Sequence, residues 1–135
     1  MKKLNYSVEN EGSVLEKPNV EVEVDALLEV SKEGILVKAK SGRRHKILPD
    51  QIEWLSSQHN YTYIIKGNEK YCVPVQFGKL LKKLDCPALM RIHKCYAINT
   101  YKEFEQDGNR VFINKAEIPI GKTYKANFMK HFTKL

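Results

Sequence analysis

Apolar and polar residues alternate along most of the chain from residue 31 onward, in short runs separated by turn residues. A period of two is typical of strands that have one buried face. The first two predicted strands are residues 34–39 and 44–48, joined by the turn sequence Lys40-Ser41-Gly42-Arg43. Further strands are predicted at residues 51–55, 61–65, 69–73, 89–92, 95–99, 101–106, 110–114 and 117–120.

Two hairpins are indicated by short turns that contain glycine. Lys66-Gly67-Asn68 and Asp107-Gly108-Asn109 each separate two of the predicted strands. Gly and Asn suit the tight connection of antiparallel strands, because both residues tolerate left-handed backbone angles. The strands on either side of each turn are therefore expected to pair with each other.

Helical spacing occurs in only two places. Between residues 75 and 84 the apolar residues recur at intervals of three or four, with lysines on the other face. Near the end of the chain, Tyr124, Phe128 and Phe132 lie four residues apart. Strands and helices do not alternate in the way that would predict a parallel sheet. The pattern thus predicts a mainly β, antiparallel fold with one short internal helix and a C-terminal helix.

Residues 1–30 differ from the rest of the chain. They hold three basic and seven acidic residues, a net charge of −4, and Gly12 and Pro18 interrupt any regular pattern. Residues 20–24 alternate valine with glutamate, as in a half-exposed strand, although residues 25–28 would also suit a short helix. The sequence therefore predicts a partly flexible acidic leader at residues 1–30, followed by one folded domain at 31–135.

The folded domain is strongly basic. Residues 31–135 carry 20 basic and nine acidic residues, a net charge of +11. This excess favours a polyanionic partner, although many basic domains simply have a solvated lysine surface. Three scattered cysteines fit a reducing compartment rather than a disulfide framework. With no membrane-length apolar run and no signal-peptide pattern, a cytoplasmic location is expected.

The residues that could carry catalysis do not gather into a pattern. His45, His59, His93 and His131 are spread along the chain, and none has a zinc-like spacing to the cysteines. Acidic residues after residue 30 are sparse, and no glycine-rich phosphate-binding loop is present. We therefore expect no enzymatic activity, no metal, no cofactor and no small-molecule substrate.

Four segments stand in a specific order along the chain. Ile52-Glu53-Trp54-Leu55 leads through a polar loop to Asn60-Tyr61-Thr62-Tyr63-Ile64, and a helical segment with Leu80-Leu81-Lys82-Lys83-Leu84 follows. Next come Arg91-Ile92-His93-Lys94-Cys95-Tyr96-Ala97-Ile98-Asn99 and finally Ile118-Pro119-Ile120-Gly121-Lys122-Thr123-Tyr124. Together these segments resemble the LytTR family of DNA-binding domains. The third is similar to the family's arginine-x-histidine-arginine-serine-x-x-valine-asparagine run.

The LytTR resemblance implies an elongated set of small antiparallel sheets that binds double-stranded DNA in a sequence-specific manner. In that family, the output module of many bacterial response regulators, loops at sheet edges enter successive major grooves at promoter direct repeats. A homodimer on DNA and an upstream sensor or membrane regulator protein are the further partners expected. An RNA-binding or protein-interaction module of similar β architecture is the alternative, and exposed stacking aromatics would favour RNA.

The first candidate DNA-contacting segment is the polar loop at residues 56–62, where the resemblance implies base contacts. Amide side chains such as those of Gln58 and Asn60 form paired hydrogen bonds with adenine edges. His59 suits a base acceptor or a phosphate, and Thr62 completes this candidate set. From the residues alone, an ordinary polar turn would be the better interpretation, and the resemblance reverses this preference.

The second candidate segment contains Arg91, His93 and Lys94, and the resemblance implies that it faces DNA. Lys94 stands where the family usually has arginine, and lysine lacks the planar fork that reads guanine. We therefore expect Lys94 to contact a phosphate or a single acceptor. Arg91 is expected on the DNA backbone, or else as a brace through a local carboxylate. His93 would alternatively form a hydrogen bond within the turn.

The third candidate segment precedes the final helix and contains Lys122, Thr123 and Lys125. The family typically has serine-arginine where this chain has Gly121-Lys122, so an N-cap is lost and paired base contacts suit this position less well. Lys122 at a helix N-terminus is expected to bind a phosphate. Lys125 would add to the positive charge, or would be an ordinary surface lysine. The basic cluster at residues 43–46 is interpreted as a solvated hairpin tip.

Overall fold

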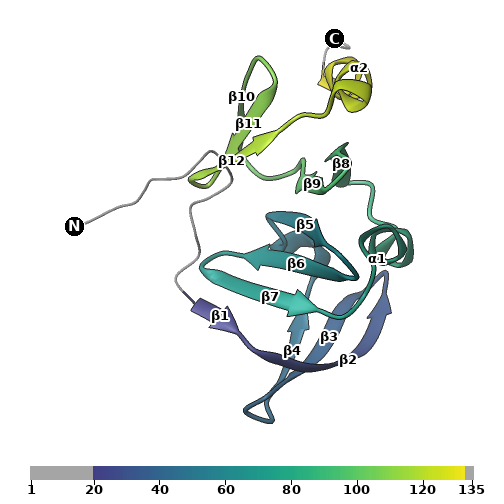
Figure 1. Cartoon of the computed structure of the whole chain (residues 1–135), viewed down its shortest axis with the longest axis vertical. Helices are drawn as coiled ribbons and strands as arrows, with labels where there is room; N and C mark the ends of the chain where they lie inside the picture. Colours follow the sequence, from purple (N-terminus) through teal and green to yellow (C-terminus); the bar gives the residue numbers. More distant parts are fainter. Residues whose placement is uncertain (1–19, 133–135) are drawn as a thin grey trace, which may run out of the picture.

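The computed structural model describes residues 20–132, and it is built mainly of strands (Figure 1). In chain order the elements are β1 (Val20–Val22), β2 (Val24–Ser31), β3 (Gly34–Ala39), β4 (Arg44–Ile47), η1 (Pro49–Gln51), β5 (Trp54–Gln58), β6 (Tyr61–Lys66), β7 (Glu69–Val73), α1 (Phe77–Leu84), β8 (Leu89–His93), β9 (Tyr96–Asn99), β10 (Glu105–Asp107), β11 (Arg110–Ile113), β12 (Ala116–Pro119) and α2 (Lys122–Phe132). The predicted fold class, with one short internal helix and a C-terminal helix, is confirmed.

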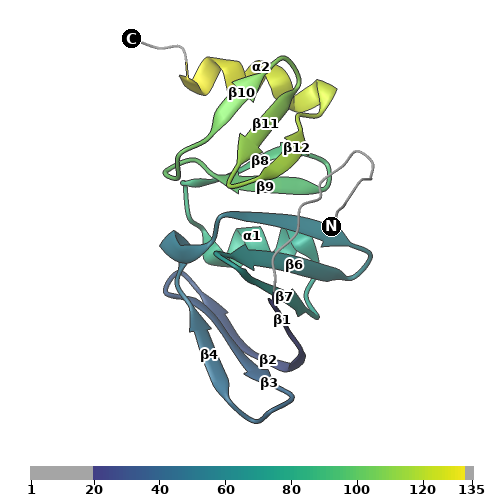
Figure 2. The same ribbon diagram turned by 90° about the vertical axis from the view of Figure 1, so that its left-hand side faces the viewer.

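The strands form three sheets. The central sheet has the order β1-β7-β6-β5-β9-β8, the N-terminal sheet is β2-β3-β4, and the C-terminal sheet is β10-β11-β12. Figures 1 and 2 show the N-terminal sheet at one end of the long axis and the C-terminal sheet with α2 at the other. The described strand pairs are antiparallel except for β1 and β7, which run parallel. The central sheet therefore lies between two other layers.

Both faces of the central sheet are buried. Leu55 and Ile64 pack with the N-terminal sheet and α1, whereas their neighbours Trp54 and Ile65 pack with the C-terminal sheet and α2. Successive side chains of a strand point to opposite faces, so each strand contributes to both cores. This double packing fixes the strands of the central sheet and thus the turns at their ends.

The fold includes residues that the sequence assigned to the leader. β2 pairs with β3 over its whole length, and β1 lies beside β7 with Val22 opposite Tyr71. The alternative of a short helix at residues 25–28 is wrong, because this segment lies within β2. The register of β2 shifts twice, which breaks the alternation that would have revealed a strand. The predicted flexible segment at residues 1–17 lies outside the described residues.

One predicted strand is much shorter than expected. Residues 101–106 were expected to be extended, but only Glu105–Asp107 forms β10. The amide of Tyr101 donates to the Asn99 side-chain oxygen (2.9 Å), and the amide of Lys102 donates to the Asn99 carbonyl (3.1 Å). These bonds make a turn directly after β9. Asn99 is itself buried and also donates to the Ile52 carbonyl at 2.8 Å, so the turn is tied to the central sheet.

Candidate nucleic-acid interface

The turn between β5 and β6 presents three consecutive exposed residues, Gln58, His59 and Asn60. Gln58 pairs with Tyr61 across the hairpin, so His59 and Asn60 form a two-residue connection. His59 has a φ of 57°, a left-handed conformation that histidine adopts more readily than most residues with a Cβ. Within residues 20–132, no hydrogen bond engages these three side chains. Their amide and imidazole groups are therefore available to an external partner.

Thr62 does not belong to this exposed turn, which corrects its predicted place among the DNA contacts. Its side chain is fully buried, and its Oγ1 donates a 2.8 Å hydrogen bond to the Val75 carbonyl. Thr62 shares a face of β6 with Ile64, and that face packs toward the N-terminal sheet and α1. The hydroxyl thus ties β6 to the segment before α1 and has no access to a duplex.

Arg91 braces the turn between β8 and β9. Its Nη2 donates a 2.6 Å hydrogen bond to the Lys94 carbonyl, and its guanidinium carbon lies 4.8 Å from the centre of the Phe77 ring. The structure shows Arg91 in this bracing role, and its contact with the DNA backbone stays a prediction. The brace acts through a backbone carbonyl and a ring rather than through the carboxylate that the sequence suggested. Arg91 thereby fixes the position of Lys94, whose own side chain is exposed.

His93 also holds the β8–β9 turn, as the alternative interpretation proposed. Its Nδ1 accepts a 2.9 Å hydrogen bond from the amide of Cys95, and its ring lies 5.1 Å from that of Tyr96. Burial, together with the nearby charge of Lys94, lowers the pKa of His93 below its usual value. A neutral imidazole that accepts at Nδ1 must carry its proton at Nε2. His93 therefore retains one ring N–H donor that the turn does not use.

The start of α2 lies directly against the β8–β9 turn. The amide of Gly121 donates to the Ile92 carbonyl at 2.7 Å, and a Cβ at position 121 would lie only 3.3 Å from His93 Cα. Lys122 and Thr123 follow at the exposed beginning of the helix. Glycine thus suits the start of α2, because a Cβ there would require its neighbours to shift by a few tenths of an ångström.

Lys125 is turned toward the C-terminal sheet. Its Nζ donates a 2.6 Å hydrogen bond to Asn109 Oδ1, in the turn between β10 and β11. The side chain is partly buried, unlike those of Lys122 and Thr123. Its predicted contribution to DNA contact is therefore weakened, because its ammonium group already links α2 to a hairpin.

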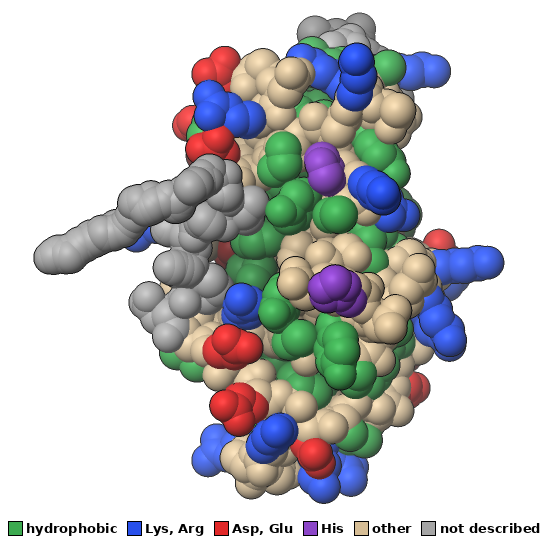
Figure 3. Space-filling view, in the orientation of Figure 1, with side chains coloured by type: hydrophobic (Ala, Val, Ile, Leu, Met, Phe, Trp, Pro, Cys, Tyr) green, Lys and Arg blue, Asp and Glu red, His purple; other side chains and the backbone are tan. Residues whose placement is uncertain are grey.

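The central sheet brings the remaining candidates together at one edge. The amide of Ser57 donates to the Cys95 carbonyl at 2.8 Å, so the β5–β6 and β8–β9 turns project from the same end of the sheet. We call the surface formed by residues 58–60, 93–94 and 122–123 the turn edge. Figure 2 shows its three segments on the right-hand side of the molecule, which faces the viewer in Figures 1 and 3.

Charge is unevenly distributed around the turn edge. Figure 3 shows histidine side chains exposed near the middle of this face, with Lys and Arg mostly to their right and at the two ends. Acidic side chains gather mainly toward the left and the lower part of the same view. Of the basic cluster at residues 43–46, Arg43 lies in the exposed turn between β3 and β4 at the far end of the N-terminal sheet, as predicted, and Arg44 is the first residue of β4. His45 and Lys46 lie within β4 rather than at a hairpin tip, and His45 Nδ1 is 3.2 Å from the Tyr71 hydroxyl. Positive charge therefore borders the turn edge on its right, where basic side chains outnumber acidic ones in this view.

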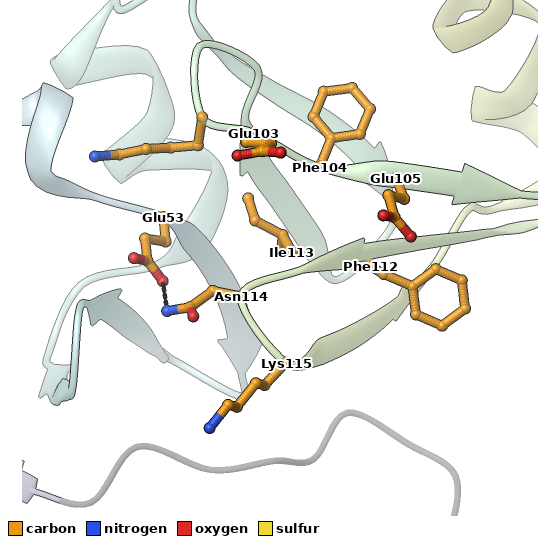
Figure 4. A pocket seen from close by; sticks show the side chains of 9 residues that line it. Glu53, Glu103, Phe104, Glu105, Phe112, Ile113, Asn114 and Lys115 are labelled. Carbon is orange, nitrogen blue, oxygen red and sulfur yellow. Dashed lines mark hydrogen bonds between the residues drawn. The ribbon is translucent and has the colours of Figure 1, made fainter.

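A cavity of about 470 Å³ lies at the opposite end of β5 from the turn edge (Figure 4). Its lining includes Glu53, Phe104 and Phe112, and Asn114 Nδ2 donates a 2.8 Å hydrogen bond to Glu53 Oε1. It contains neither histidine nor cysteine. No group of metal-ligating side chains that could hold an ion is found in residues 20–132. None of the helices in this range is both long and apolar enough to cross a membrane.

Comparison with known proteins identifies the family. The family model described as the LytTr DNA-binding domain matches residues 42–133, which is more than half of the chain. Among solved structures, a LytTr DNA-binding domain from Bacillus cereus, of a protein described as a methyl-accepting/DNA response regulator, shares the fold with a TM-score of 0.59. The two are 13% identical, and the match covers 82% of this chain and 99% of that one. No curated protein gives a significant match. The chain belongs to the LytTR family of DNA-binding domains.

Proposed function

We propose that this chain binds double-stranded DNA in a sequence-specific manner, as the DNA-binding domain of a bacterial transcription regulator, through the turn edge. The observation that carries this proposal is the convergence of three segments that span more than sixty residues of sequence. The bonds from Ser57 to Cys95 and from Gly121 to Ile92 hold these segments side by side. Amide, imidazole and ammonium donors at one edge match the acceptors of bases and phosphates.

The three segments divide affinity and specificity between them. Lys94 and Lys122 neutralise phosphates and release counterions, which gives most of the affinity and a steep dependence on salt. Gln58 and Asn60 contact base edges in a major groove, where an amide pairs well with adenine. His93 offers its remaining ring N–H to a base acceptor or a phosphate. The turns thereby enter successive grooves along one side of the duplex.

Two copies on direct repeats would give the complex its full affinity. A single small domain buries only a modest area on DNA, roughly 600–1,000 Å² for modules of this size. A second copy on a neighbouring half-site, as a homodimer on DNA, would add its own contacts without enlarging the domain. Control by an upstream sensor or membrane regulator protein is part of the same proposal, because such control would suit a domain that contacts DNA through its turn edge.

The decisive experiment is selection of bound duplexes from a random pool, followed by a salt titration on the selected site. Lys94→Ala and Lys122→Ala should each flatten the slope of log K against log[salt] by about one unit. Lys115→Ala, at the β11–β12 turn, is the control and should leave the slope unchanged. No enrichment of any duplex, or preferential binding of single-stranded RNA in competition, would overturn the proposal.

A further inference from the structure

One face of α1 carries lysines that the core does not use. Phe77, Leu80 and Leu84 are buried against the strands, whereas Lys79, Lys82 and Lys83 are exposed. Figure 3 shows basic side chains projecting from the edge of the molecule where α1 lies in Figure 1. A lysine face on an amphipathic helix is ordinarily just solvated. Its position beside the turn edge suggests a more specific role.

The first turn of α1 lies between the two turns of the central sheet. On one side, Lys79 and Lys83 line a groove of about 620 Å³ together with Asn60 of the β5–β6 turn. On the other side, Arg91 packs over Phe77 at 4.8 Å while it holds the Lys94 carbonyl at 2.6 Å. α1 thus continues the turn edge rather than facing away from it.

These lysines have no acidic partner in the described part of the chain. Among residues 20–132, no carboxylate lies within 4 Å of the ammonium groups of Lys79 and Lys83, although Glu29 lines the same groove. Asp85, at the end of α1, is instead paired with Lys32 at 3.3 Å. Within residues 20–132, the two ammonium groups beside Asn60 therefore take part in no ion pair.

The position of Lys79 is unfavourable for the helix itself. Gln76 caps α1, and its side chain accepts the amide of Lys79 at 3.1 Å, so Lys79 is the third helical residue. The partial positive charge of a helix N-terminus favours a carboxylate there and disfavours a lysine. Lys83, in the last turn, suits the helix dipole and has a structural reason to be basic. Lys79 has none, which points to a role in binding.

We propose that Lys79, supported by Lys83, forms a further phosphate-binding site that grips the DNA backbone next to the base contacts of Asn60. This inference rests on the proposed function and extends it to an element outside the LytTR-like turns. Lys79 and Lys83 both line the groove and are four residues, about one helical turn, apart on α1. They would therefore follow neighbouring phosphates of one strand and contact every DNA sequence equally.

Lys79→Glu separates this binding role from a structural one. The change should raise or preserve the melting temperature, because glutamate suits the first turn of a helix. It should also weaken binding about tenfold on both the selected duplex and a scrambled duplex, with a slope at least one unit flatter. Lys79→Ala should show about half of this effect on a logarithmic scale. Lys115→Glu makes the same reversal of charge at the β11–β12 turn, and it should change DNA affinity less than about twofold.

The outcomes distinguish the two proposals. If the wild-type chain binds no duplex in dilute salt, the proposed function fails and this inference falls with it. If Lys94→Ala weakens binding but both Lys79 variants bind as tightly as wild type, the turn edge stands and the α1 site is wrong. An equal loss in Lys115→Glu would mean that long-range charge explains the result, which also overturns the site. If Lys79→Glu lowers the melting temperature, the DNA affinity of Lys79→Ala is the test instead. A loss of affinity supports the α1 site, and an unchanged affinity overturns it.

Discussion

The β5–β6 turn and the β8–β9 turn lie at the same edge of the central sheet but are held by different means. In the β8–β9 turn, Arg91 holds the Lys94 carbonyl, Cys95 donates to His93, and Gly121 of the neighbouring segment donates to Ile92. In the β5–β6 turn, the backbone of the hairpin is the support, and the three exposed side chains form no hydrogen bond within residues 20–132. One turn is braced and the other leaves its side chains unengaged.

This contrast suggests a division of tasks within the interface. A braced turn keeps a lysine and an N–H donor in place before DNA arrives, so little ordering is required on binding. Such fixed contacts suit phosphates, which repeat along every duplex and set the orientation of the protein. Unengaged amides can adjust to the particular edge of a base pair. Variants that affect the two turns should therefore change different quantities.

The largest expected effect is that of Arg91→Lys. Lysine keeps the charge but loses the planar fork and the stacking on Phe77, so the brace should fail. The free energy of unfolding should fall by about 1.5–3 kcal/mol, the value of a hydrogen bond to a charged group. DNA affinity should fall about tenfold because Lys94 is no longer held. Urea unfolding and fluorescence anisotropy measure both, with Arg44→Lys in β4 as the control. Unchanged affinity would mean that the Arg91 brace is not needed to position Lys94 for DNA binding.

Asn60→Ala should affect specificity without affecting stability. The side chain is exposed and unbonded within residues 20–132, so the free energy of unfolding should change by less than about 0.5 kcal/mol. Discrimination at one base pair of the selected site should fall by about 1–2 kcal/mol, whereas affinity for a scrambled duplex should remain. Asn68→Ala, in the β6–β7 turn, is the matched control. A uniform loss of affinity on all duplexes would assign Asn60 to the backbone and remove the contrast between the turns.

Gly121→Ala should lower the free energy of unfolding by about 1 kcal/mol and reduce DNA affinity a few-fold. The new methyl would lie 3.1 Å from Tyr124 Cδ2 and 3.3 Å from His93 Cα, so the Tyr124 ring and the contact between α2 and the braced turn must shift by a few tenths of an ångström. Gly78→Ala provides a control of opposite sign, because its Cβ would meet only ordinary contacts at 3.7 and 3.9 Å within a helix. That change should stabilise the protein. Equal stability of the two variants in thermal melts would show that the approach of α2 to His93 is loose.

Local patterns predicted an element well where its own residues contain the pattern that specifies it. The glycine turns at residues 67 and 108 mark the β6–β7 and β10–β11 hairpins, and helical spacing locates α1 and α2. β2 was harder to predict, because its two register shifts break the alternation of apolar and polar residues. The parallel pairing of β1 with β7 joins segments almost fifty residues apart, and no local pattern specifies such a contact.

The candidate site was predicted less completely than the fold. Exposed loop residues such as Gln58 and Lys94 follow from the resemblance and from their polarity. The burial of Thr62 does not, because both faces of β6 are covered and alternation cannot say which polar residue points inward. The Arg91 brace ends on a backbone carbonyl, which carries no residue-type signal. The lysines of α1 look like any solvated helical face until the groove they share with Asn60 is known.

The smallest expected effect concerns the pH dependence of the braced turn. Burial, with help from the charge of Lys94, lowers the pKa of His93, and Nδ1 must stay unprotonated to accept from Cys95. Below the ordinary histidine value of about 6.5, the unfolded chain therefore binds a proton at this position that the folded chain resists. The free energy of unfolding should fall as the pH drops below that value. Urea unfolding of wild type and His93→Asn at about pH 5.5 and pH 7.5 isolates this contribution, since other groups titrate alike in both. The variant should lose less stability on acidification. If both lose the same amount, the turn does not depend on neutral His93, and its rigidity must come from Arg91 and Gly121 alone.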